Sequence, residues 1–251
     1  MSSLRVENLS VSIENKLVLR DVSFELKRGE IISIMGPNGS GKTSLALAIM
    51  GHPKYEILSG RILLDDEEIT HLSPDERSLR GLFLAFQNPI EVKGIRLSTL
   101  IFSALNKRRG ERNLLKSDPK IIPLLMQNLR EVGLSNDHLH RDVNLGFSGG
   151  EKKRAELLQA LMLKPKFLIL DEPDSGLDVD GIKITAKKIK ELASQGTGII
   201  IITHYARLLK YLSPKEIIVI SDGKIIARGG SELSYLIEEK GYEALKGDLN
   251  A

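Results

Sequence analysis

The chain has 251 residues, which is enough for one large domain or two small ones with a substantial buried core. Its 36 lysine and arginine residues nearly balance its 33 aspartate and glutamate residues, so the net charge of +3 does not indicate a nucleic-acid partner. The absence of cysteine excludes disulfides, and it excludes thiolate ligands for zinc or for an iron–sulfur cluster.

Short strands and one short helix are predicted in the first third of the chain. Apolar alternation or a continuous apolar run predicts strands at 22–27, 31–35, 62–64 and 82–86. Between the last two, Ser73, Pro74 and Glu76 supply an N-cap, a proline in the first turn and a capping-box glutamate. These three residues predict the start of a helix.

The loop after the 31–35 strand predicts a nucleotide phosphate site. It reads Gly36-Pro37-Asn38-Gly39-Ser40-Gly41-Lys42-Thr43, which matches the pattern G-x-x-x-x-G-K-[ST]. Its glycines let the backbone N–H groups turn inward around phosphate oxygens. A helix is predicted to follow the loop, with Ser44 in its first turn, and its positive N-terminal end points at the same phosphate oxygens. We expect Lys42 to reach the β- and γ-phosphates and the Thr43 hydroxyl to bind Mg²⁺.

Helical patterns replace strands from about residue 88 to residue 160. After Pro119, apolar residues recur at helical spacing at Ile121, Leu125, Leu129 and Val132. This segment therefore predicts a helical insertion.

Strand signals return in the last third. Residues 167–170 and 199–202 are continuous apolar runs, typical of a parallel sheet that is covered on both faces. The apolar spacing over 182–193 predicts a crossover helix between them, and Asp222-Gly223 between two apolar pairs predicts a hairpin. The layout is that of one α/β unit with a helical insertion.

Two acids, Asp171 and Glu172, end the 167–170 strand, where open α/β sheets bind their ligands. We expect Asp171 to hold Mg²⁺ through water, and Glu172 to polarise the attacking water.

A second anion site is predicted at Ser148-Gly149-Gly150-Glu151, which opens a helix. The glycines allow close backbone approach, and the Ser148 hydroxyl adds to the helix N-terminus. Ser-Gly-Gly alone is commonly an ordinary loop, but this one lies 23 residues before Asp171, and that position makes it a strong signal for an anion site.

In this order the motifs resemble those of the ATP-binding-cassette ATPases, over essentially the whole chain. Residues 36–43 look like the Walker A loop, and Gln87 looks like the Q-loop glutamine that contacts Mg²⁺ and senses the γ-phosphate. His204, which follows the 199–202 strand, looks like the switch histidine on the γ-phosphate. The other histidines, including His138 and His140, show no metal pattern, and we expect them to be exposed to solvent.

Residues 148–151 resemble the family signature, and Ser175-Gly176-Leu177-Asp178 looks like the D-loop. Phe147 and Glu151 depart from the family pattern, which more commonly has leucine and glutamine there. The resemblance implies an ATP-dependent head-to-tail dimer, in which the signature of one chain acts on the nucleotide of the other.

The resemblance also implies a fold and an activity. The fold is α/β, with a phosphate-loop (RecA-like), mainly parallel sheet core, an N-terminal antiparallel β subdomain and a helical insertion. Residues 1–251 form one ATPase domain, with the β subdomain and core at 1–87 and 161–251 and the helical subdomain at 88–160. The activity is Mg²⁺-dependent hydrolysis of ATP to ADP and phosphate, with Glu172, His204 and Gln87 as catalytic residues.

One position departs from the family at the base of the nucleotide. Many members place an aromatic residue against adenine, where this chain has Ile13. We expect an aliphatic contact there, and adenine held more loosely than by a stacked ring.

Within the family, four segments resemble the SufC subfamily, the ATPases of the Suf iron–sulfur cluster assembly system: 85–95, 141–154, 174–180 and 203–209. Asp174 stands where transporter ATPases usually have threonine or serine, and Tyr205 where they often have an acid. Pro173 departs from the subfamily toward the general pattern. The resemblance implies SufB- and SufD-like scaffold partners, bound through the helical subdomain and the Q-loop region.

Two other classes of protein remain open. One is the nucleotide-binding subunit of a membrane transporter, docked on a permease through 88–160. The other is an ATP-dependent clamp on nucleic acid, which the nearly neutral charge and the lack of a long coiled-coil insertion disfavour. No apolar run approaches a membrane span and no signal-peptide core is present, so we expect a cytoplasmic protein without direct membrane insertion.

Overall fold

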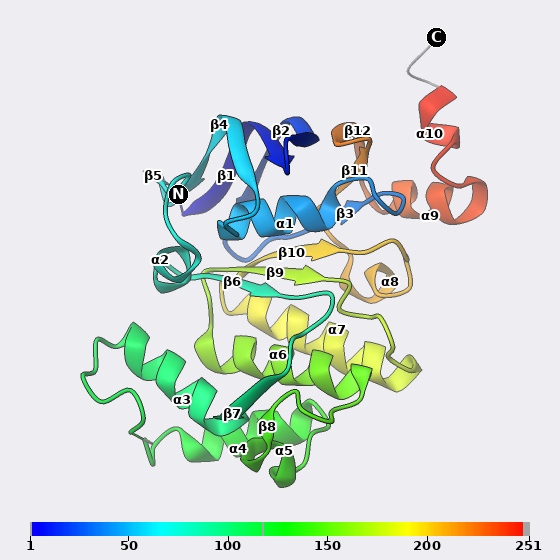
Figure 1. Ribbon diagram of the computed structural model, residues 1–251. Helices are drawn as coiled ribbons and strands as arrows, with labels where there is room; N and C mark the ends of the chain where they lie inside the picture. Colours follow the sequence, from blue (N-terminus) through cyan, green and yellow to red (C-terminus); the bar gives the residue numbers. More distant parts are fainter. Residues whose placement is uncertain (1, 117, 248–251) are drawn as a thin grey trace.

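The structure is a computed structural model that describes residues 2–116 and 118–247. Met1 and residues 248–251, the ends of the expected 1–251 domain, lie outside the described residues. Figure 1 shows an antiparallel sheet above a second sheet, one helix between the two, and further helices below.

The central sheet is mainly parallel, as its continuous apolar runs predict. Its strands are β3 (Ile31–Met35), β6 (Leu82–Ala85), β9 (Phe167–Asp171), β10 (Gly198–Ile202), β11 (Glu216–Ser221) and β12 (Lys224–Gly229). They lie in the order β12-β11-β3-β10-β9-β6, and only the edge strand β12 is antiparallel to its neighbour. The turn between β11 and β12 has positive φ at both Asp222 and Gly223, as a tight hairpin requires.

The N-terminal antiparallel sheet covers one face of this central sheet. Its strands are β1 (Ser3–Ile13), β2 (Lys16–Lys27), β4 (Glu56–Leu64) and β5 (Glu67–Glu68), in the order β2-β1-β4-β5. Helix α1 (Lys42–Met50) lies between the sheets, and α2 (Pro74–Leu79) begins at the predicted capping box of Ser73 and Glu76.

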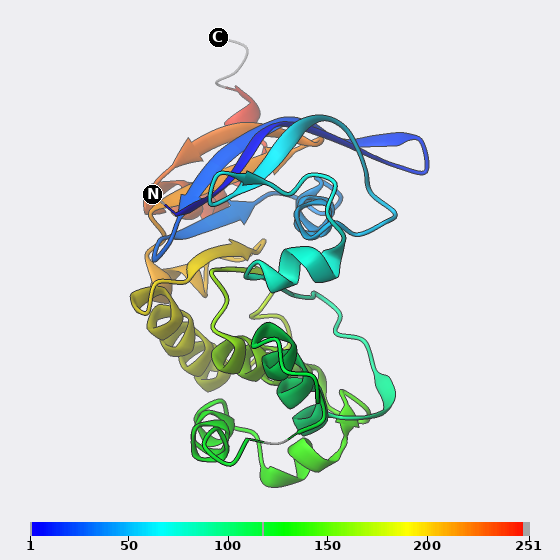
Figure 2. The ribbon, with the colours of Figure 1, turned by 90° about the vertical axis from the view of Figure 1, so that its left-hand side faces the viewer.

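Helices lie on the other side of the central sheet. Those that pack on its strands are α6 (Gly149–Leu163), α7 (Val179–Ser194), α9 (Ser231–Lys240) and α10 (Ala244–Gly247). The others pack mainly on helices: α3 (Leu97–Arg108) and α4 (Ile122–Glu131) on α6, α5 (Asn136–His140) on α3, and α8 (Leu209–Leu212) on α7. Within the described residues, no helix has the length and apolar character needed to cross a membrane. Figure 2 shows the helical segment in green, at the end of the molecule away from the antiparallel sheet.

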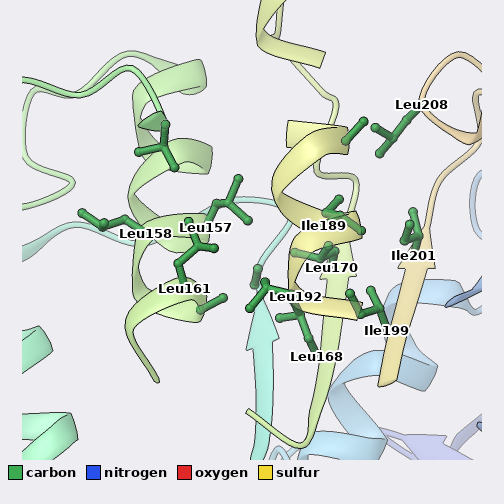
Figure 3. Close-up of a cluster of buried hydrophobic side chains, with 14 of the residues drawn as sticks. Leu157, Leu158, Leu161, Leu168, Leu170, Ile189, Leu192, Ile199, Ile201 and Leu208 are labelled. Atoms are coloured by element: carbon green, nitrogen blue, oxygen red, sulfur yellow. The ribbon is translucent and has the colours of Figure 1, made fainter. Parts of the chain in front are cut away.

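The core divides along the strands. On β3, Ile32 and Ile34 pack in the cluster with α1 and the antiparallel sheet, whereas Ile31 and Met35 pack in the cluster with α6 and α7. Figure 3 shows the second cluster, in which side chains of β9 and β10 meet those of α6 and α7. The expected α/β fold with its antiparallel subdomain is confirmed.

One feature of the 88–160 segment was not predicted. It contains a small antiparallel pair, β7 (Val92–Arg96) and β8 (Asp142–Val143), beside the helices. All residues of β7 after Val92 are exposed, so the strand carries no apolar alternation that a sequence pattern could reveal.

Candidate functional site

The predicted phosphate loop joins the end of β3 to the start of α1. A side chain on Gly36 would place its Cβ 2.1 Å from the carbonyl oxygen of Ile220, so only glycine fits against the neighbouring strand. Gly41, the N-cap of α1, has a φ of 108°, which also requires glycine. The turn thereby leaves the backbone N–H groups at the N-terminus of α1 directed toward the mouth of the loop.

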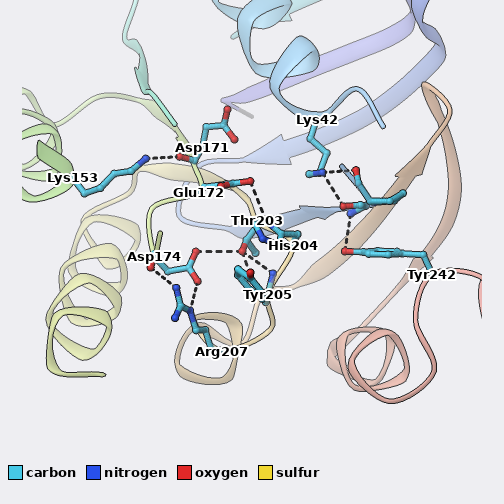
Figure 4. A network of polar contacts seen from close by, with 12 residues as sticks. Lys42, Lys153, Asp171, Glu172, Asp174, Thr203, His204, Tyr205, Arg207 and Tyr242 are labelled. Atoms are coloured by element: carbon cyan, nitrogen blue, oxygen red, sulfur yellow. Dashed lines mark hydrogen bonds and ion pairs between the residues drawn. The ribbon is translucent and has the colours of Figure 1, made fainter. Parts of the chain in front are cut away.

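Lys42 is buried within this loop, at 6% exposure. Its Nζ donates hydrogen bonds to the carbonyl oxygens of Gly36 at 2.8 Å and Pro37 at 2.9 Å (Figure 4). Burial lowers the pKa of Lys42, and the nearby carboxylates of Glu172 and Asp171 oppose that shift. The ammonium is therefore poised where phosphate oxygens can replace the loop's own carbonyls as acceptors.

The loop lines a pocket of about 270 Å³ together with residues from two other segments. The lining residues are Asn38, Gly39, Ser40, Gly41, Lys42, Thr43, Ser44, Gln87 and Glu172. Gln87 follows β6, and Glu172 follows β9. The parallel sheet thus brings the predicted phosphate loop, Q-loop glutamine and catalytic acid to one pocket, because the carboxyl ends of its strands share an edge.

Asp171 ends β9, and only 3% of it is exposed. Burial raises its pKa, and a hydrogen bond from the Thr43 hydroxyl works in the opposite direction. Its Oδ1 is buried and makes no hydrogen bond within the described part of the chain. The Asp171 carboxylate thus bonds the Thr43 hydroxyl and keeps one oxygen without a partner, while Thr43 and the Gln87 amide line the pocket. Mg²⁺ prefers oxygen donors of these kinds, so the residues fit that ion.

Glu172 faces His204. Nδ1 of His204 lies 3.0 Å from Oε1 of Glu172 (Figure 4), and the Glu172 N–H donates to the carbonyl oxygen of Ile202 at 2.8 Å. Glu172 has a φ of 48°, an unusual backbone conformation for a residue other than glycine, of the kind that often occurs at functional sites. The contact fixes the orientation of a carboxylate that lines the pocket.

The signature residues lie at a second pocket. Ser148 is the N-cap of α6, where its Oγ accepts from the Glu151 N–H at 3.3 Å while Oε2 of Glu151 accepts from the Ser148 N–H at 2.7 Å. The pocket has a volume of about 410 Å³ and is lined by Ser148, Gly149, Gly150, Glu151, Arg154, Gly176, Leu177 and Asp178. Among the described residues, none lines both this pocket and the phosphate-loop pocket.

The predicted D-loop joins the two pockets along the backbone. Asp178 caps α7 by accepting from the Gly181 N–H at 2.7 Å and lines the signature pocket. Ser175 is exposed and lines neither pocket, but its N–H donates to the carbonyl oxygen of Glu172 at 3.2 Å.

Ile13, the residue expected to contact adenine, lies apart from the phosphate-loop pocket. It ends β1, is half-buried and does not line that pocket.

The expectation that the His138 side chain is exposed to solvent was wrong. His138 is only 9% exposed, because its ring packs edge-on against Phe147 with the ring centroids 4.9 Å apart. His140, two residues further along, is exposed as expected.

Sequence reasoning missed two polar residues that bond to the backbone of the site, Lys153 and Tyr242, and one buried acid close to Lys153. Nζ of Lys153 on α6 donates to the carbonyl oxygens of Phe86 at 2.8 Å and Asp171 at 3.0 Å, and the Gly36 N–H donates to the Tyr242 hydroxyl at 3.2 Å. Glu156 lies buried on α6, and burial raises its pKa to about 8. An acid within the apolar run of α6 was a visible signal for Glu156, whereas no local pattern pointed to Tyr242.

The comparisons with known proteins agree with this geometry. A protein-family model described as ABC transporter matches residues 19–175. The chain is 44% identical to vegetative protein 296 of Bacillus subtilis, over 99% of this chain and 95% of that protein. It is 45% identical to a probable ABC transporter ATP-binding protein of Streptococcus pyogenes, over 99% of this chain and 97% of that protein.

Solved structures show the same architecture. A nucleotide-free ATP-binding cassette from an ABC transporter matches with a TM-score of 0.77 and 26% identity, over 98% of this chain and 99% of that one. The ADP conformation of an ATP-binding cassette of an ABC transporter matches with a TM-score of 0.76 and 26% identity, over 98% of each chain. The chain therefore belongs to the ABC transporter family of ATP-binding proteins.

Proposed function

We propose that the chain is a cytoplasmic, Mg²⁺-dependent ATPase subunit that couples hydrolysis to a movement of a bound protein partner. The observation that carries the proposal is the phosphate-loop pocket, which Lys42, Gln87 and Glu172 line together, with Asp171 directly behind Thr43. The pocket therefore combines phosphate binding, a metal site and a candidate base.

Different residues would bind the phosphates, bind the metal ion and accept the proton. Lys42 holds the β- and γ-phosphates, and Thr43, Gln87 and Asp171 would hold Mg²⁺, which neutralises phosphate charge when bound. Glu172 accepts the proton of the attacking water, and its contact with His204 at 3.0 Å keeps the carboxylate oriented toward the γ-phosphate.

We propose that hydrolysis is shared between two chains arranged head to tail. Ser148 to Glu151 and Asp178 lie at a pocket separate from the phosphate loop, so within one chain they do not reach its nucleotide. A partner chain facing the phosphate loop would bring its signature, with the positive end of α6, against the γ-phosphate. The D-loop, with Ser175 and Asp178, would lie between the two sites.

The 88–160 segment is the proposed docking region for the partner, in the division of the domain expected from the sequence. It extends away from the antiparallel sheet, and it follows Gln87 directly in the chain. A displacement of this segment by a bound partner would therefore be transmitted to the phosphate-loop pocket through Gln87. A membrane permease is the partner that the names of the relatives favour, since several are described as ABC transporter ATP-binding proteins.

A SufB/SufD-type scaffold is the second candidate, and it has its own supporting observation. Asp174, on which the SufC resemblance partly rests, is 1% exposed, and its carboxylate accepts from Nε of Arg207 at 2.8 Å and from the Thr203 hydroxyl at 3.3 Å. Arg207 also donates to the Asp174 carbonyl oxygen at 2.6 Å. Asp174, which precedes the D-loop, is thus held by Thr203 and Arg207, and all three residues lie in segments that resemble the SufC subfamily.

The ATPase rate of the purified chain, measured with each partner, tests the proposal. Hydrolysis should require Mg²⁺, stop with EDTA, and rise when the functional partner is added. Stimulation by a purified SufB/SufD-type scaffold would establish the assembly role, and stimulation by a permease in membranes would establish the transporter role. Absence of Mg²⁺-dependent hydrolysis under all these conditions would contradict the proposal.

A further inference from the structure

His138 contacts both residues at which this chain departs from the family signature. Phe147 and Glu151 flank the signature glycines, and the His138 ring packs edge-on against Phe147 with an interplanar angle of 83°. On the same side chain, Nε2 lies 3.3 Å from Oε1 of Glu151. Both departures in the sequence therefore contact the same side chain, a histidine that helix α5 places behind the signature.

The contacts of His138 Nδ1 are all with Ser135. Nδ1 accepts from the Ser135 N–H at 3.2 Å, and it lies 2.8 Å from the Ser135 hydroxyl oxygen and 3.3 Å from the Ser135 carbonyl oxygen. Because a backbone N–H can only donate, we assign Nδ1 as the acceptor and place the proton of the neutral ring on Nε2. Nε2 is buried and makes no hydrogen bond of good geometry among the described residues, and its charged neighbour is Oε1 of Glu151 at 3.3 Å.

Phe147 is held from a second direction as well. The guanidinium of Arg141, the residue after α5, lies 4.9 Å from the centroid of the Phe147 ring, and its Nη2 donates to the carbonyl oxygens of Leu145 at 3.0 Å and Gly146 at 2.8 Å. The loop that enters the signature is therefore supported by α5 and by the residue that follows it.

We propose that His138 is a positioning residue for the signature. Through its Nε2–H and its ring, it orients Glu151 and Phe147 so that Ser148 and the N-terminus of α6 face the partner chain's γ-phosphate. This inference rests on the proposed sharing of hydrolysis between two chains. It places the effect of His138 on the neighbour's nucleotide and not on its own.

His138→Phe keeps a ring on Phe147 but removes the N–H. We expect kcat to fall about tenfold, in the range of coupling between residues in contact, while the affinity of the isolated chain for ATP stays unchanged. His138→Gln, which restores an N–H donor, should recover most of the rate, and the exposed His140→Gln is the matched control. A wild-type rate in His138→Phe would overturn the proposal.

Mixing variants separates positioning from damage to the fold. His138→Phe chains mixed with Lys42→Ala chains should regain activity, because one interface then joins an intact phosphate loop to an intact signature. A mixture of Ser148→Arg and Lys42→Ala chains is the reference. If the reference mixture recovers activity but the His138→Phe mixture does not, the proposed role of His138 is overturned while the shared site stands. If the reference mixture does not recover activity, both the shared site and this inference are overturned.

A measurement on the unaltered protein keeps the proposal testable if His138→Phe does not fold. Long-range ¹H–¹⁵N NMR correlations of the His138 ring should show the Nε2–H form of the neutral imidazole. The Nδ1–H form would overturn the proposal, because Nε2 would then have no proton to direct at Glu151.

Discussion

At the scale of single residues, Lys42 shows how the loop prepares for its ligand. Its ammonium is buried and bonded to two carbonyl oxygens of the loop, and its pKa is lowered by burial. Phosphate oxygens are charged acceptors and form stronger hydrogen bonds with an ammonium than carbonyls do. Under the proposed function, ATP binding would therefore gain a charged contact with Lys42 and would relieve the unfavourable burial of its ammonium.

Lys42→Ala should weaken ATP binding by several kcal/mol, which is at least about a hundredfold in Kd. Isothermal titration with Mg·ATP measures the effect, and the exposed Lys54→Ala is the control. Equal affinity in Lys42→Ala and the parent would mean that the phosphate loop is wrongly assigned.

Glu172→Gln should bind ATP normally but hydrolyse it at least about a hundredfold more slowly, because an amide cannot accept the proton of water. Equilibrium binding measures the affinity for ATP, and single-turnover kinetics measure the rate of hydrolysis, so the two measurements together separate binding from catalysis. If the rate does not change, the base lies elsewhere, with His204 at 3.0 Å as the next candidate.

Glu156 links pH to stability. Burial raises its pKa to about 8, so between pH 4.5 and pH 8 the folded protein binds a proton that the unfolded chain has released. This group's contribution to the free energy of unfolding is therefore fully present below about pH 4.5 and is lost as the pH rises toward about 8.

Glu156→Gln removes that dependence. Since one unit of pKa shift corresponds to about 1.4 kcal/mol, we expect it to be more stable than the parent at about pH 8, by at least about 1 kcal/mol, and the advantage to vanish at about pH 4.5. Urea unfolding at several pH values checks this, with the exposed Glu239→Gln as control. Parallel pH profiles for Glu156→Gln and the parent would contradict the assignment.

At the scale of elements, Arg77 shows how a short helix supports the helix that follows the phosphate loop. From α2, its guanidinium donates to the carbonyl oxygens of Ala48 at 2.9 Å and Ile49 at 2.7 Å in the last turn of α1, and to those of Thr70 at 2.7 Å and Leu72 at 2.9 Å. Burial lowers its pKa to about 10. The C-terminus of α1 is thus capped by a cation, which also suits the helix dipole.

Arg77→Met should lower the free energy of unfolding by about 2–4 kcal/mol, because it leaves buried carbonyl groups without a donor. Urea denaturation measures the loss, and amide hydrogen exchange should localise it to the end of α1. The half-buried Arg80→Met, on the next turn, serves as the control. A loss no greater than that of the control would show that Arg77 does not support α1.

The elements that local chemistry defines were predictable. The 31–35 strand, the capping box at Ser73, and the hairpin at Asp222-Gly223 each carry their signal within a few residues, and the structure confirms all three. Strand β7 was not predictable, because its exposed residues pair with β8 from nearly 50 positions further along and leave no apolar pattern.

At the scale of the whole molecule, the pocket was predictable only in part. The resemblance to the ATP-binding-cassette ATPases indicated that Lys42, Gln87 and Glu172 belong to one site, and the structure places them on one pocket because a parallel sheet brings together the carboxyl ends of its strands. Support from Tyr242, about 200 residues from Gly36, and the burial of His138 depend on tertiary packing that no local spacing encodes.

The central proposal also concerns the whole molecule: each ATP hydrolysis site is formed by residues from two chains. The phosphate-loop pocket and the signature pocket have no lining residue in common among the described residues, which agrees with the proposal that each chain carries two half-sites. A pair of chains would complete both, and a partner that holds two copies close together would raise their effective concentration.

The most direct test mixes Lys42→Ala chains with Ser148→Arg chains and measures ATP hydrolysis against each variant alone. In a mixed pair, one interface combines both lesions, and the other joins an intact phosphate loop to an intact signature. The account predicts that each variant alone is nearly inactive and that the mixture recovers activity. Normal hydrolysis by Ser148→Arg chains alone, at any concentration, would contradict it.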